Sequence, residues 1–194
     1  MKHLDRAVQL ELLPSVPAWM RAVLLENGVS ISSRVHPKSM IAAGTAVAEE
    51  RGAGMMGVWA VQAIPAGAYI YSFNGPLVTK PTTYTIQVEE NAHVDCADES
   101  RFTNHSCDAN AMLRYQDGVA QLIAVRDIAR DEQVTFNYNT TEWKMASPFS
   151  CRCGTSNCAG LVAGMKHLDR AVQLELLPSV PAWMRARLLE SCDV

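Results

Sequence analysis

The sequence predicts a β-rich α+β fold, with one strand-rich central domain and helical segments at both ends. Between Val29 and Asn139 the chain alternates short stretches rich in β-branched and aromatic residues with turns that contain Gly, Pro or Asn. Outside this region the apolar residues recur at helical spacing instead. The 194 residues, 48% of them hydrophobic and 19% charged, are enough for one domain with a buried core.

Strands are expected in the central region because each stretch has the residue types that strands favour. Turns that contain glycine or proline separate these stretches, and Asp117-Gly118 predicts a tight hairpin turn between the fourth strand and the fifth. The expected strands cover residues 57–63, 69–73, 84–88, 111–115, 120–124 and 133–136.

One segment of the chain occurs twice. Residues 165–190 repeat residues 1–26 and differ only at Arg187, where the first copy has Val23. Two copies that a whole domain separates cannot stack on each other as the units of a solenoid do. Their near identity indicates a recent duplication, and a second copy with its own function is the alternative.

Each copy predicts a helical hairpin. In the second copy Leu168, Val172 and Leu176 lie four residues apart and form an apolar face of a first helix, which Pro178 ends. Ser179 is then expected to cap a second helix. We expect the apolar faces to pack on the core, and a homodimer formed through the hairpins is the alternative. The corresponding residues of the first copy are Leu4, Val8, Leu12, Pro14 and Ser15, and Trp19, Met20 and Leu24 supply the apolar face of its second helix.

Charge and hydropathy exclude two classes of partner. The 17 Lys and Arg against 20 Asp and Glu give a net charge of −3, which disfavours direct binding to nucleic acid. The uncharged stretch 52–79 is interrupted by Gly and Pro, so no membrane span is expected. No apolar segment follows Met1, so we expect no signal peptide. The sequence therefore predicts a soluble cytoplasmic protein, or a nuclear one in a eukaryote.

The cysteines indicate a metal site. Cys151, Cys153 and Cys158 form a C-x-C-x4-C pattern in a stretch rich in Gly, Ser and Asn, which lets three thiolates face one centre. A tetrahedral Zn²⁺ needs a fourth ligand. His167 lies at an expected helix start, so the candidate is the distant Cys107. Three unrelated thiols in a loop are the alternative.

Several motifs in a fixed order resemble the SET-domain family of S-adenosylmethionine-dependent lysine methyltransferases, including its post-SET zinc segment. They are GMMGVWA, IPAG, YSFNG, RFTNHSCDAN, DEQVTFNYNTTEW and CRCGTSNC, and the resemblance extends from about Ser33 to Gly164. It implies small β-sheets, with the NHSC segment threaded beneath a loop as a pseudoknot. The expected divisions are a helical hairpin at 1–28, a SET domain at 29–146, a post-SET zinc segment at 147–164 and a second hairpin at 165–194.

The resemblance implies two bound groups. One is Zn²⁺, with Cys107 as the fourth ligand beside the C-x-C-x4-C cysteines. The other is S-adenosylmethionine, for which Asn104 has an amide suited to the methionine tail and His105 has backbone groups suited to the adenine edge. Gly57 lets the chain approach the cofactor closely. The implied cofactor residues are Met56, Gly57, Trp59, Arg101, Phe102, Asn104 and His105.

The resemblance also implies catalytic roles. Tyr138 matches the family's catalytic tyrosine, whose hydroxyl orients the amine and the transferred methyl group. Phe136 matches the position that controls how many methyl groups fit. Tyr84 and Phe149 are candidate walls of the substrate channel. Ordinary aromatic packing is the alternative for Phe136 and Tyr138.

The motifs leave the chemical class of the substrate open. Met55 and Ala109 replace a glycine and a proline that are usual in the family, and the segment from Lys80 to Ser100 is short for gripping an extended peptide. The leading hypothesis is methyl transfer to a protein lysine. The alternatives are transfer to a small amine or natural-product intermediate, and a catalytically silent zinc-stabilised interaction module.

Overall fold

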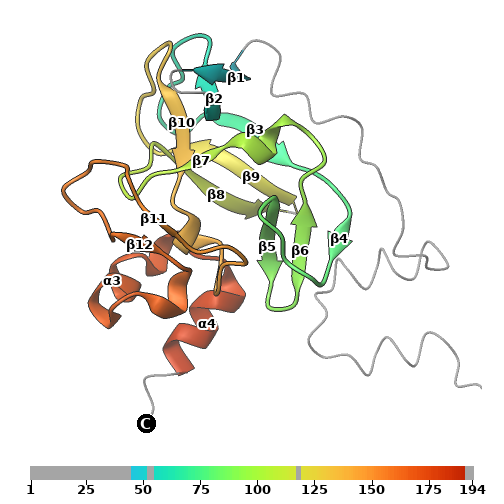
Figure 1. Cartoon of the computed structure of the whole chain (residues 1–194), viewed down its shortest axis with the longest axis vertical. Coiled ribbons are helices and arrows are strands. Elements are labelled where there is room, and N and C mark those ends of the chain that lie inside the picture. Colours follow the sequence, from blue (N-terminus) through green and yellow to red (C-terminus); the bar gives the residue numbers. More distant parts are fainter. Residues whose placement is uncertain (1–44, 52–54, 117–118, 191–194) are drawn as a thin grey trace, which may run out of the picture. The chain divides into compact units, whose positions relative to one another are not determined.

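The computed structural model describes residues 45–51, 55–116 and 119–190, which all belong to one compact unit (Figure 1). The first helical hairpin, at 1–26, and the turn at Asp117-Gly118 lie outside the described residues. None of the helices in the described ranges is long and apolar enough to cross a membrane.

The described strands form small sheets, as the sequence predicts. The first sheet contains, in spatial order, β1 (Ala46–Arg51), β2 (Met55–Ala60), β10 (Gln133–Phe136) and β7 (Asn104–His105). The second contains β3 (Tyr69–Phe73), β9 (Val119–Ala124) and β8 (Ala111–Gln116). The third contains β4 (Leu77–Val78), β6 (Ala92–Asp95) and β5 (Thr85–Glu89). A short hairpin joins β11 (Phe149–Ser150) to β12 (Leu161–Val162). The strand-rich fold class is therefore confirmed.

Each of the six expected strands is present within a few residues of its expected bounds, but the sequence pattern missed the others. β1 ends in Glu49, Glu50 and Arg51, which are poor strand formers, and it forms because it pairs with β2 along its whole length. β4, β7, β11 and β12 have two residues each, too few for a period-two pattern. Pairing with a distant segment creates these strands, rather than local propensity.

β10 joins distant parts of the chain. Its first residues pair antiparallel with β2, and its last residues, Thr135 and Phe136, pair parallel with Asn104 and His105 of β7. The buried Asn110 side chain extends this network: its Nδ2 donates to the Gln133 carbonyl oxygen at 2.8 Å, and its Oδ1 accepts from the Thr135 N–H at 2.9 Å. The end of β10 is thereby fixed beside the NHSC segment.

The main core lies between the sheets. Tyr71 packs edge-on against Phe73 with ring centroids 5.4 Å apart, and Phe73 packs in the same way against Phe136 at 5.7 Å. Burying an apolar side chain of this size contributes roughly 1.5–3 kcal/mol. The Tyr71 hydroxyl is satisfied by a hydrogen bond with the Thr103 hydroxyl. This core supports the strand end that precedes Tyr138.

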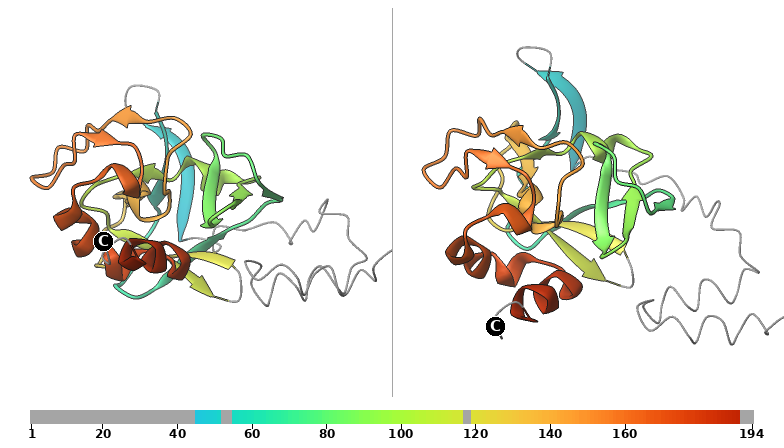
Figure 2. Two further views of the ribbon diagram at one scale, coloured as in Figure 1. Left: turned by 90° about the horizontal axis from the view of Figure 1, so that it is seen from below. Right: turned by 60° about the horizontal axis from the view of Figure 1, so that its bottom comes forward.

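The C-terminal hairpin forms a second core with α3 (Arg170–Glu175) and α4 (Ala182–Glu190), which lie beside the β11–β12 hairpin in both views of Figure 2. The Met165 N–H donates to the Glu142 carbonyl oxygen at 2.8 Å, and the Lys166 N–H donates to the Trp143 carbonyl oxygen at 3.2 Å. The hairpin is therefore attached to the chain just after β10. Its buried apolar residues are Met165, Val180, Met184 and Leu188.

Two details of the expected hairpin are wrong. Val172 does not face the core but is 37% exposed, because α3 is only six residues long and is followed by a 3₁₀ turn at Leu177–Ser179. Ser179 lies in that turn and does not cap the second helix, because α4 begins at Ala182, immediately after Pro181. The chain bends over several residues, where the pattern predicts one sharp break at Pro178.

The difference between the two copies of the repeat falls on a residue that contacts the domain. The Arg187 guanidinium forms an ion pair with Glu90 and lies 4.5 Å from the centroid of the Trp143 ring. We expect Arg187→Val, which introduces the residue of the first copy, to lower the free energy of unfolding by about 1 kcal/mol. Denaturant titration measures this change.

A double-mutant cycle with Glu90→Gln separates the ion pair from the stacking on Trp143. If Arg187→Val unfolds at the same denaturant concentration as the wild type, these contacts do not stabilise the hairpin.

Candidate active site and metal centre

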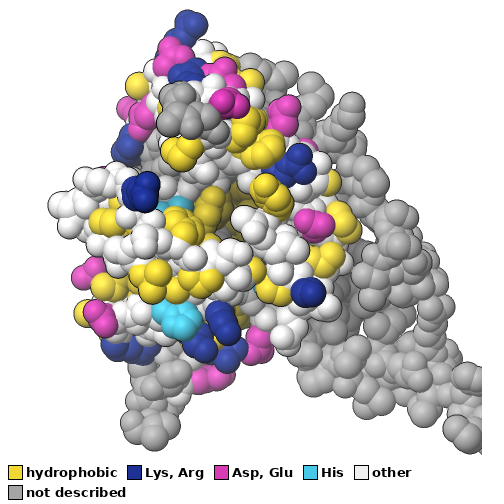
Figure 3. Space-filling view, in the orientation of Figure 1, with side chains coloured by type: hydrophobic (Ala, Val, Ile, Leu, Met, Phe, Trp, Pro, Cys, Tyr) yellow, Lys and Arg dark blue, Asp and Glu magenta, His cyan; other side chains and the backbone are white. Residues whose placement is uncertain are grey.

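A cavity with a volume of about 190 Å³ lies where the end of β10 meets the 3₁₀ helix η1 (Glu99–Phe102), the start of β5 and the segment before β11. Hydrophobic side chains gather around a hollow near the middle of the face drawn in Figure 3. The cavity brings together eight residues that the sequence analysis selected, namely Met56, Tyr84, Arg101, Phe102, Asn104, Phe136, Tyr138 and Phe149.

Tyr138 presents a neutral hydroxyl to this cavity. The hydroxyl donates its proton to the Thr103 carbonyl oxygen at 2.6 Å, and this leaves lone pairs on the phenol oxygen for a ligand. Burial, with smaller contributions from Cys96 and Glu142, holds the pKa of Tyr138 well above its ordinary value. The hydroxyl is therefore suited to accept a hydrogen bond and is poorly suited to act as a phenolate base.

Aromatic rings shape the cavity. Phe136 is buried, and its ring centroid lies 4.8 Å from that of Tyr138. The ring centroid of Phe149 lies 6.1 Å from that of Tyr138. Phe149 and Tyr84 are 38% and 48% exposed, so they line the part of the cavity that meets solvent. The cavity thus runs from an exposed aromatic rim to a buried aromatic base.

Asn104 and the glycine segment are in contact. The Asn104 Nδ2 donates to the Met56 carbonyl oxygen at 2.8 Å. A Cβ atom on Gly57 would lie 2.4 Å from the Gln133 Nε2 and 3.2 Å from the Asn104 Nδ2. A side chain at position 57 would therefore displace the Gln133 amide and press on Asn104, whereas glycine lets both approach β2.

Three of the expected cofactor residues do not line the cavity. Gly57 lies next to it, behind Asn104. The Trp59 indole donates to the Glu49 carbonyl oxygen at 3.3 Å and lies under the Arg51 guanidinium, 4.5 Å from it. His105 contacts Tyr138 and Cys107 instead. A cofactor role for these three residues stays a prediction from the family resemblance.

The sequence analysis missed Glu142. This residue lines the cavity and is only 7% exposed. Its N–H donates to the Tyr138 carbonyl oxygen at 3.0 Å, so the two residues are one turn of chain apart. The spacing of four residues in FNYNTTEW is the sequence signal that brings them to the same side.

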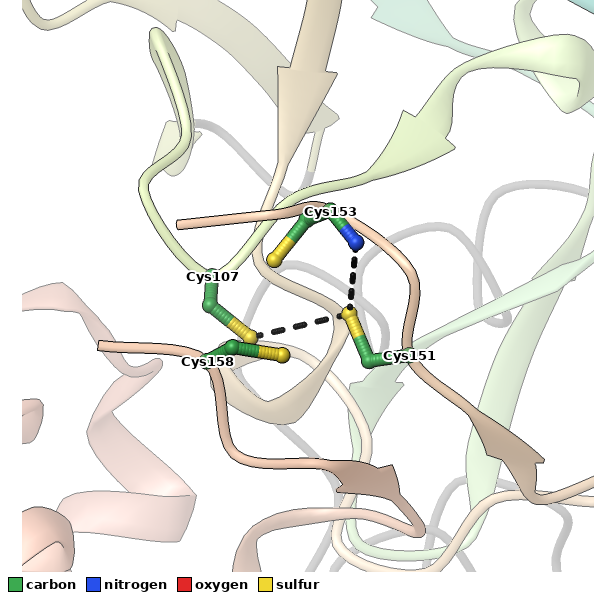
Figure 4. A group of neighbouring side chains, drawn as sticks. All are labelled: Cys107, Cys151, Cys153 and Cys158. Carbon is green, nitrogen blue, oxygen red and sulfur yellow. Dashed lines mark hydrogen bonds between the residues drawn. The ribbon is translucent and has the colours of Figure 1, made fainter. Parts of the chain in front are cut away.

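Four cysteines meet at one point, next to the cavity (Figure 4). The sulfur atoms of Cys107, Cys151, Cys153 and Cys158 all lie within 4.8 Å of one another, and those of Cys107 and Cys151 are 3.9 Å apart. Zn–S bonds of about 2.3 Å in a tetrahedron place sulfur atoms about 3.8 Å apart. The donor set and its spacing therefore fit Zn²⁺, and four thiolates would close its coordination shell.

The loop that carries three of these cysteines is tied to the NHSC segment. The Asn157 side chain donates to the Cys107 carbonyl oxygen at 3.3 Å, and the Ala159 N–H donates to the Cys107 sulfur at 3.4 Å. Burial raises the pKa of the Cys107 thiol to about 12. A cation at the centre would offset that cost by stabilising the thiolate.

His105 connects the cysteines to Tyr138. Its Nδ1 accepts from the Tyr138 N–H at 3.1 Å, and its Nε2 lies 3.3 Å from the Cys107 sulfur. Burial lowers the pKa of His105 to about 4, so the ring is neutral at physiological pH. With Nδ1 as the acceptor, the proton is on Nε2, where it can be donated to sulfur. One half-buried side chain therefore connects the cysteine cluster to the backbone of Tyr138, whose side chain lines the cavity.

We predict that the purified protein carries one Zn²⁺ per chain and that Cys153→Ser loses it, because three thiolates leave the tetrahedral shell open. Loss of the metal should lower the melting temperature and weaken binding in the cavity through His105. Metal analysis and calorimetry with S-adenosylhomocysteine measure both effects.

Cys96→Ala is the matched control, because this buried thiol lies outside the cluster and its loss should leave the zinc content unchanged. If the purified wild-type protein contains no zinc and still unfolds cooperatively, the prediction is contradicted.

Comparison with known proteins shows which family the central region matches. Residues 55–139 match the SET domain family. The methyltransferase flvH of Aspergillus flavus is 30% identical over 111 residues, which are 57% of this chain and 62% of flvH. An H3 lysine-36 specific histone-lysine N-methyltransferase of Mycosarcoma maydis is 26% identical over 188 residues, 86% of this chain but 18% of the relative.

A solved structure supports the fold. The crystal structure of KRYPTONITE in complex with mCHG DNA and SAH matches with a TM-score of 0.50 and 20% identity, over 58% of this chain and 27% of that one. This chain thus spans less than two thirds of each of the three proteins named. The match at 55–139 covers the strands that build the cavity, together with Asn104, Phe136 and Tyr138. The chain therefore contains a SET domain at residues 55–139.

Proposed function

We propose that this protein is an S-adenosylmethionine-dependent N-methyltransferase that acts on the side-chain amine of a protein lysine. The observation that carries the proposal is the position of Tyr138: its neutral hydroxyl, fixed by the Thr103 carbonyl, lines one cavity together with Asn104 and Phe136. The match of residues 55–139 to the SET domain family and the relatives named as histone-lysine methyltransferases support the same activity.

The polar groups around the cavity fit the cofactor. When bound, S-adenosylmethionine supplies a methyl group on a cationic sulfur. The Asn104 amide and the Arg101 guanidinium are groups that can hold its ammonium and carboxylate tail. Phe102, whose ring lies 4.9 Å from the Arg101 guanidinium, offers an apolar surface beside them. Met56 contributes the backbone carbonyl to which Asn104 is anchored.

The chain's own contribution to methyl transfer is positioning and desolvation. The Tyr138 oxygen accepts a hydrogen bond from the substrate amine and so fixes the direction of its lone pair. The rings of Phe136 and Phe149 exclude water from that contact. An apolar site also disfavours the ammonium form of the substrate, so the neutral nucleophile becomes more accessible.

One alternative substrate class has specific support. The flvH relative is named as a methyltransferase without a stated substrate, and the segment from Lys80 to Ser100 is short in this chain. A small amine or natural-product intermediate is therefore the second candidate. The expected cytoplasmic location stays a prediction, and a histone substrate would require a nuclear one.

Two experiments test the proposal. Calorimetry with S-adenosylmethionine measures cofactor binding, and transfer of radiolabelled methyl groups is then compared for core histones, free lysine and n-butylamine. Labelled histone lysine supports the proposal, whereas label only on small amines favours the second candidate. Cofactor binding without transfer to any amine favours the silent interaction module.

Tyr138→Phe should reduce turnover by about 10²–10³-fold, the range seen when one preorganised polar group is removed. The ring and its packing remain, so the affinity for S-adenosylhomocysteine should change little. Tyr69→Phe is the control, because it removes an exposed tyrosine hydroxyl that pairs only with Ser72 outside the cavity. Full activity of Tyr138→Phe contradicts the proposed mechanism.

Phe136→Tyr should shift the products toward monomethylation. The added hydroxyl would enter the buried base of the cavity, where it can hold a water molecule in the space that a second methyl group needs. Mass spectrometry of the product reads the ratio of mono-, di- and trimethylated amine. An unchanged ratio shows that Phe136 does not set this limit.

A further inference from the structure

Glu142 is a buried carboxyl group in the wall of the same cavity as Tyr138. The hydrogen bond from its N–H to the Tyr138 carbonyl oxygen, 3.0 Å long, closes one turn of chain between the two residues. Carboxyl groups are rarely buried to this degree without a partner. The buried carboxyl group beside the tyrosine is therefore a candidate for a role in the site.

The carboxyl group is held in place by β5. Its Oε1 accepts from the Gln87 N–H at 2.8 Å. The Gln87 side chain bridges two further backbone groups, since its Oε1 accepts from the Trp143 N–H at 2.9 Å and its Nε2 donates to the Glu90 carbonyl oxygen at 2.8 Å. This network fixes one oxygen of Glu142, a residue that lines the cavity.

No cation is paired with Glu142 within the described ranges, where every ion pair involves another acidic residue. A buried carboxylate without a cation is costly, so the site favours a ligand that brings a positive charge. Arg101 also lines the cavity, but its guanidinium lies over the rings of Phe102 and Tyr84. The ammonium group of an amine substrate is the cation that the proposed function brings to this cavity.

The ionisation of Glu142 suits the exchange of a proton near neutrality. Burial raises its pKa to about 7, while the hydrogen bond from the Gln87 N–H and the nearby Thr141 side chain act in the opposite direction. The other titratable groups near it are Tyr138 on its own turn, Tyr115 on β8 and Cys96 after β6, and burial raises the pKa of all three. These three groups are uncharged at pH 7, so Glu142 is the acceptor that can change charge there.

We propose that Glu142 binds the ammonium group of the substrate in this cavity and accepts its proton. The inference rests on the proposed function, since it assigns a role within the same site. One N–H bond of the ammonium breaks, its electron pair stays on nitrogen, and an O–H bond forms on Glu142. The neutral amine, hydrogen-bonded to Tyr138, then forms the new N–C bond as the S–C electron pair leaves with sulfur. The Glu142 proton passes to water after the methylated ammonium departs, so a further round of methylation can begin.

Glu142→Gln tests the role of the charge. Glutamine keeps an acceptor for the Gln87 N–H and nearly the same volume, so the fold should persist and the affinity for S-adenosylhomocysteine should be unchanged. At pH 7 turnover should fall by about 10²-fold, the lower end of the range for a general base. The wild-type rate should rise with pH through about 7, where the carboxylate forms, and this rise should be absent in the variant.

Two further variants complete the set. Glu142→Asp keeps a carboxylate and should be at least about tenfold more active than Glu142→Gln. Glu89→Gln is the matched control, because Glu89 is a partly buried carboxyl of raised pKa on β5 that does not line the cavity. It should retain the wild-type rate and pH profile.

A direct titration keeps the test independent of catalysis. In protein labelled with ¹³C at the glutamate side-chain carboxyl, the Glu142 signal, assigned by its absence from Glu142→Gln, should titrate near pH 7. Adding n-butylammonium chloride, which mimics the end of a lysine side chain, should lower that pKa, because a nearby cation stabilises the carboxylate. An unchanged Glu142 pKa in the presence of n-butylammonium overturns the inference.

The results distinguish the two proposals. If the wild type transfers no methyl group to any amine but the Glu142 pKa still falls with n-butylammonium, the proposed function fails and the cation site stands. If the wild type is active and Glu142→Gln has the same rate and pH profile, the role of Glu142 is only to hold the turn on β5. In that case the inference about Glu142 fails and the proposed function stands.

Discussion

The pairing of β10 on both edges is the constraint on which the site depends. β2 bonds to one edge and β7 to the other, so Phe136 and the residues after it are carried to the NHSC segment. The hydrogen bonds of Asn110 hold the same strand from a third direction. Because buried backbone groups must find partners, this arrangement leaves Tyr138 little freedom to move away from the Thr103 carbonyl.

The turn after β10 is supported from the other side by the C-terminal hairpin. Gly164, at a φ of 104°, places its N–H at 3.1 Å from the Asn139 Oδ1, and a Cβ atom there would lie 2.7 Å from the Trp143 carbonyl oxygen. The next residue, Met165, bonds to the Glu142 carbonyl. Tyr138 and Glu142 are thus held by elements that follow them in the sequence as well as by the sheet.

The cavity combines a mostly apolar lining with a few polar groups of different character. The Tyr138 hydroxyl is a neutral acceptor, Asn104 is an amide, and Glu142 is a carboxyl whose pKa lies near 7. Low polarity around such groups makes each hydrogen bond more directional and each charge more costly. This balance suits positioning an amine and removing its proton. His105 joins the four-cysteine cluster to this region, because it contacts the Cys107 sulfur at one ring nitrogen and the Tyr138 N–H at the other.

The sequence by itself determined the strand-rich fold class, the resemblance to the SET domain and eight residues of the cavity, because motifs such as FNYN and RFTNHSC can be recognised in a single sequence. It also indicated that Cys107 is the distant fourth thiol. Only the tertiary structure decided which residues meet. Trp59 lies under Arg51, away from the cavity, because the pairing of β1 with β2 directs it there. In the sequence, nothing distinguishes Glu142 from the other acidic residues. Its hydrogen bond from the Gln87 N–H and its burial, which raises its pKa, follow from the fold. Burial and pairing between distant segments depend on long-range packing, which no local pattern encodes.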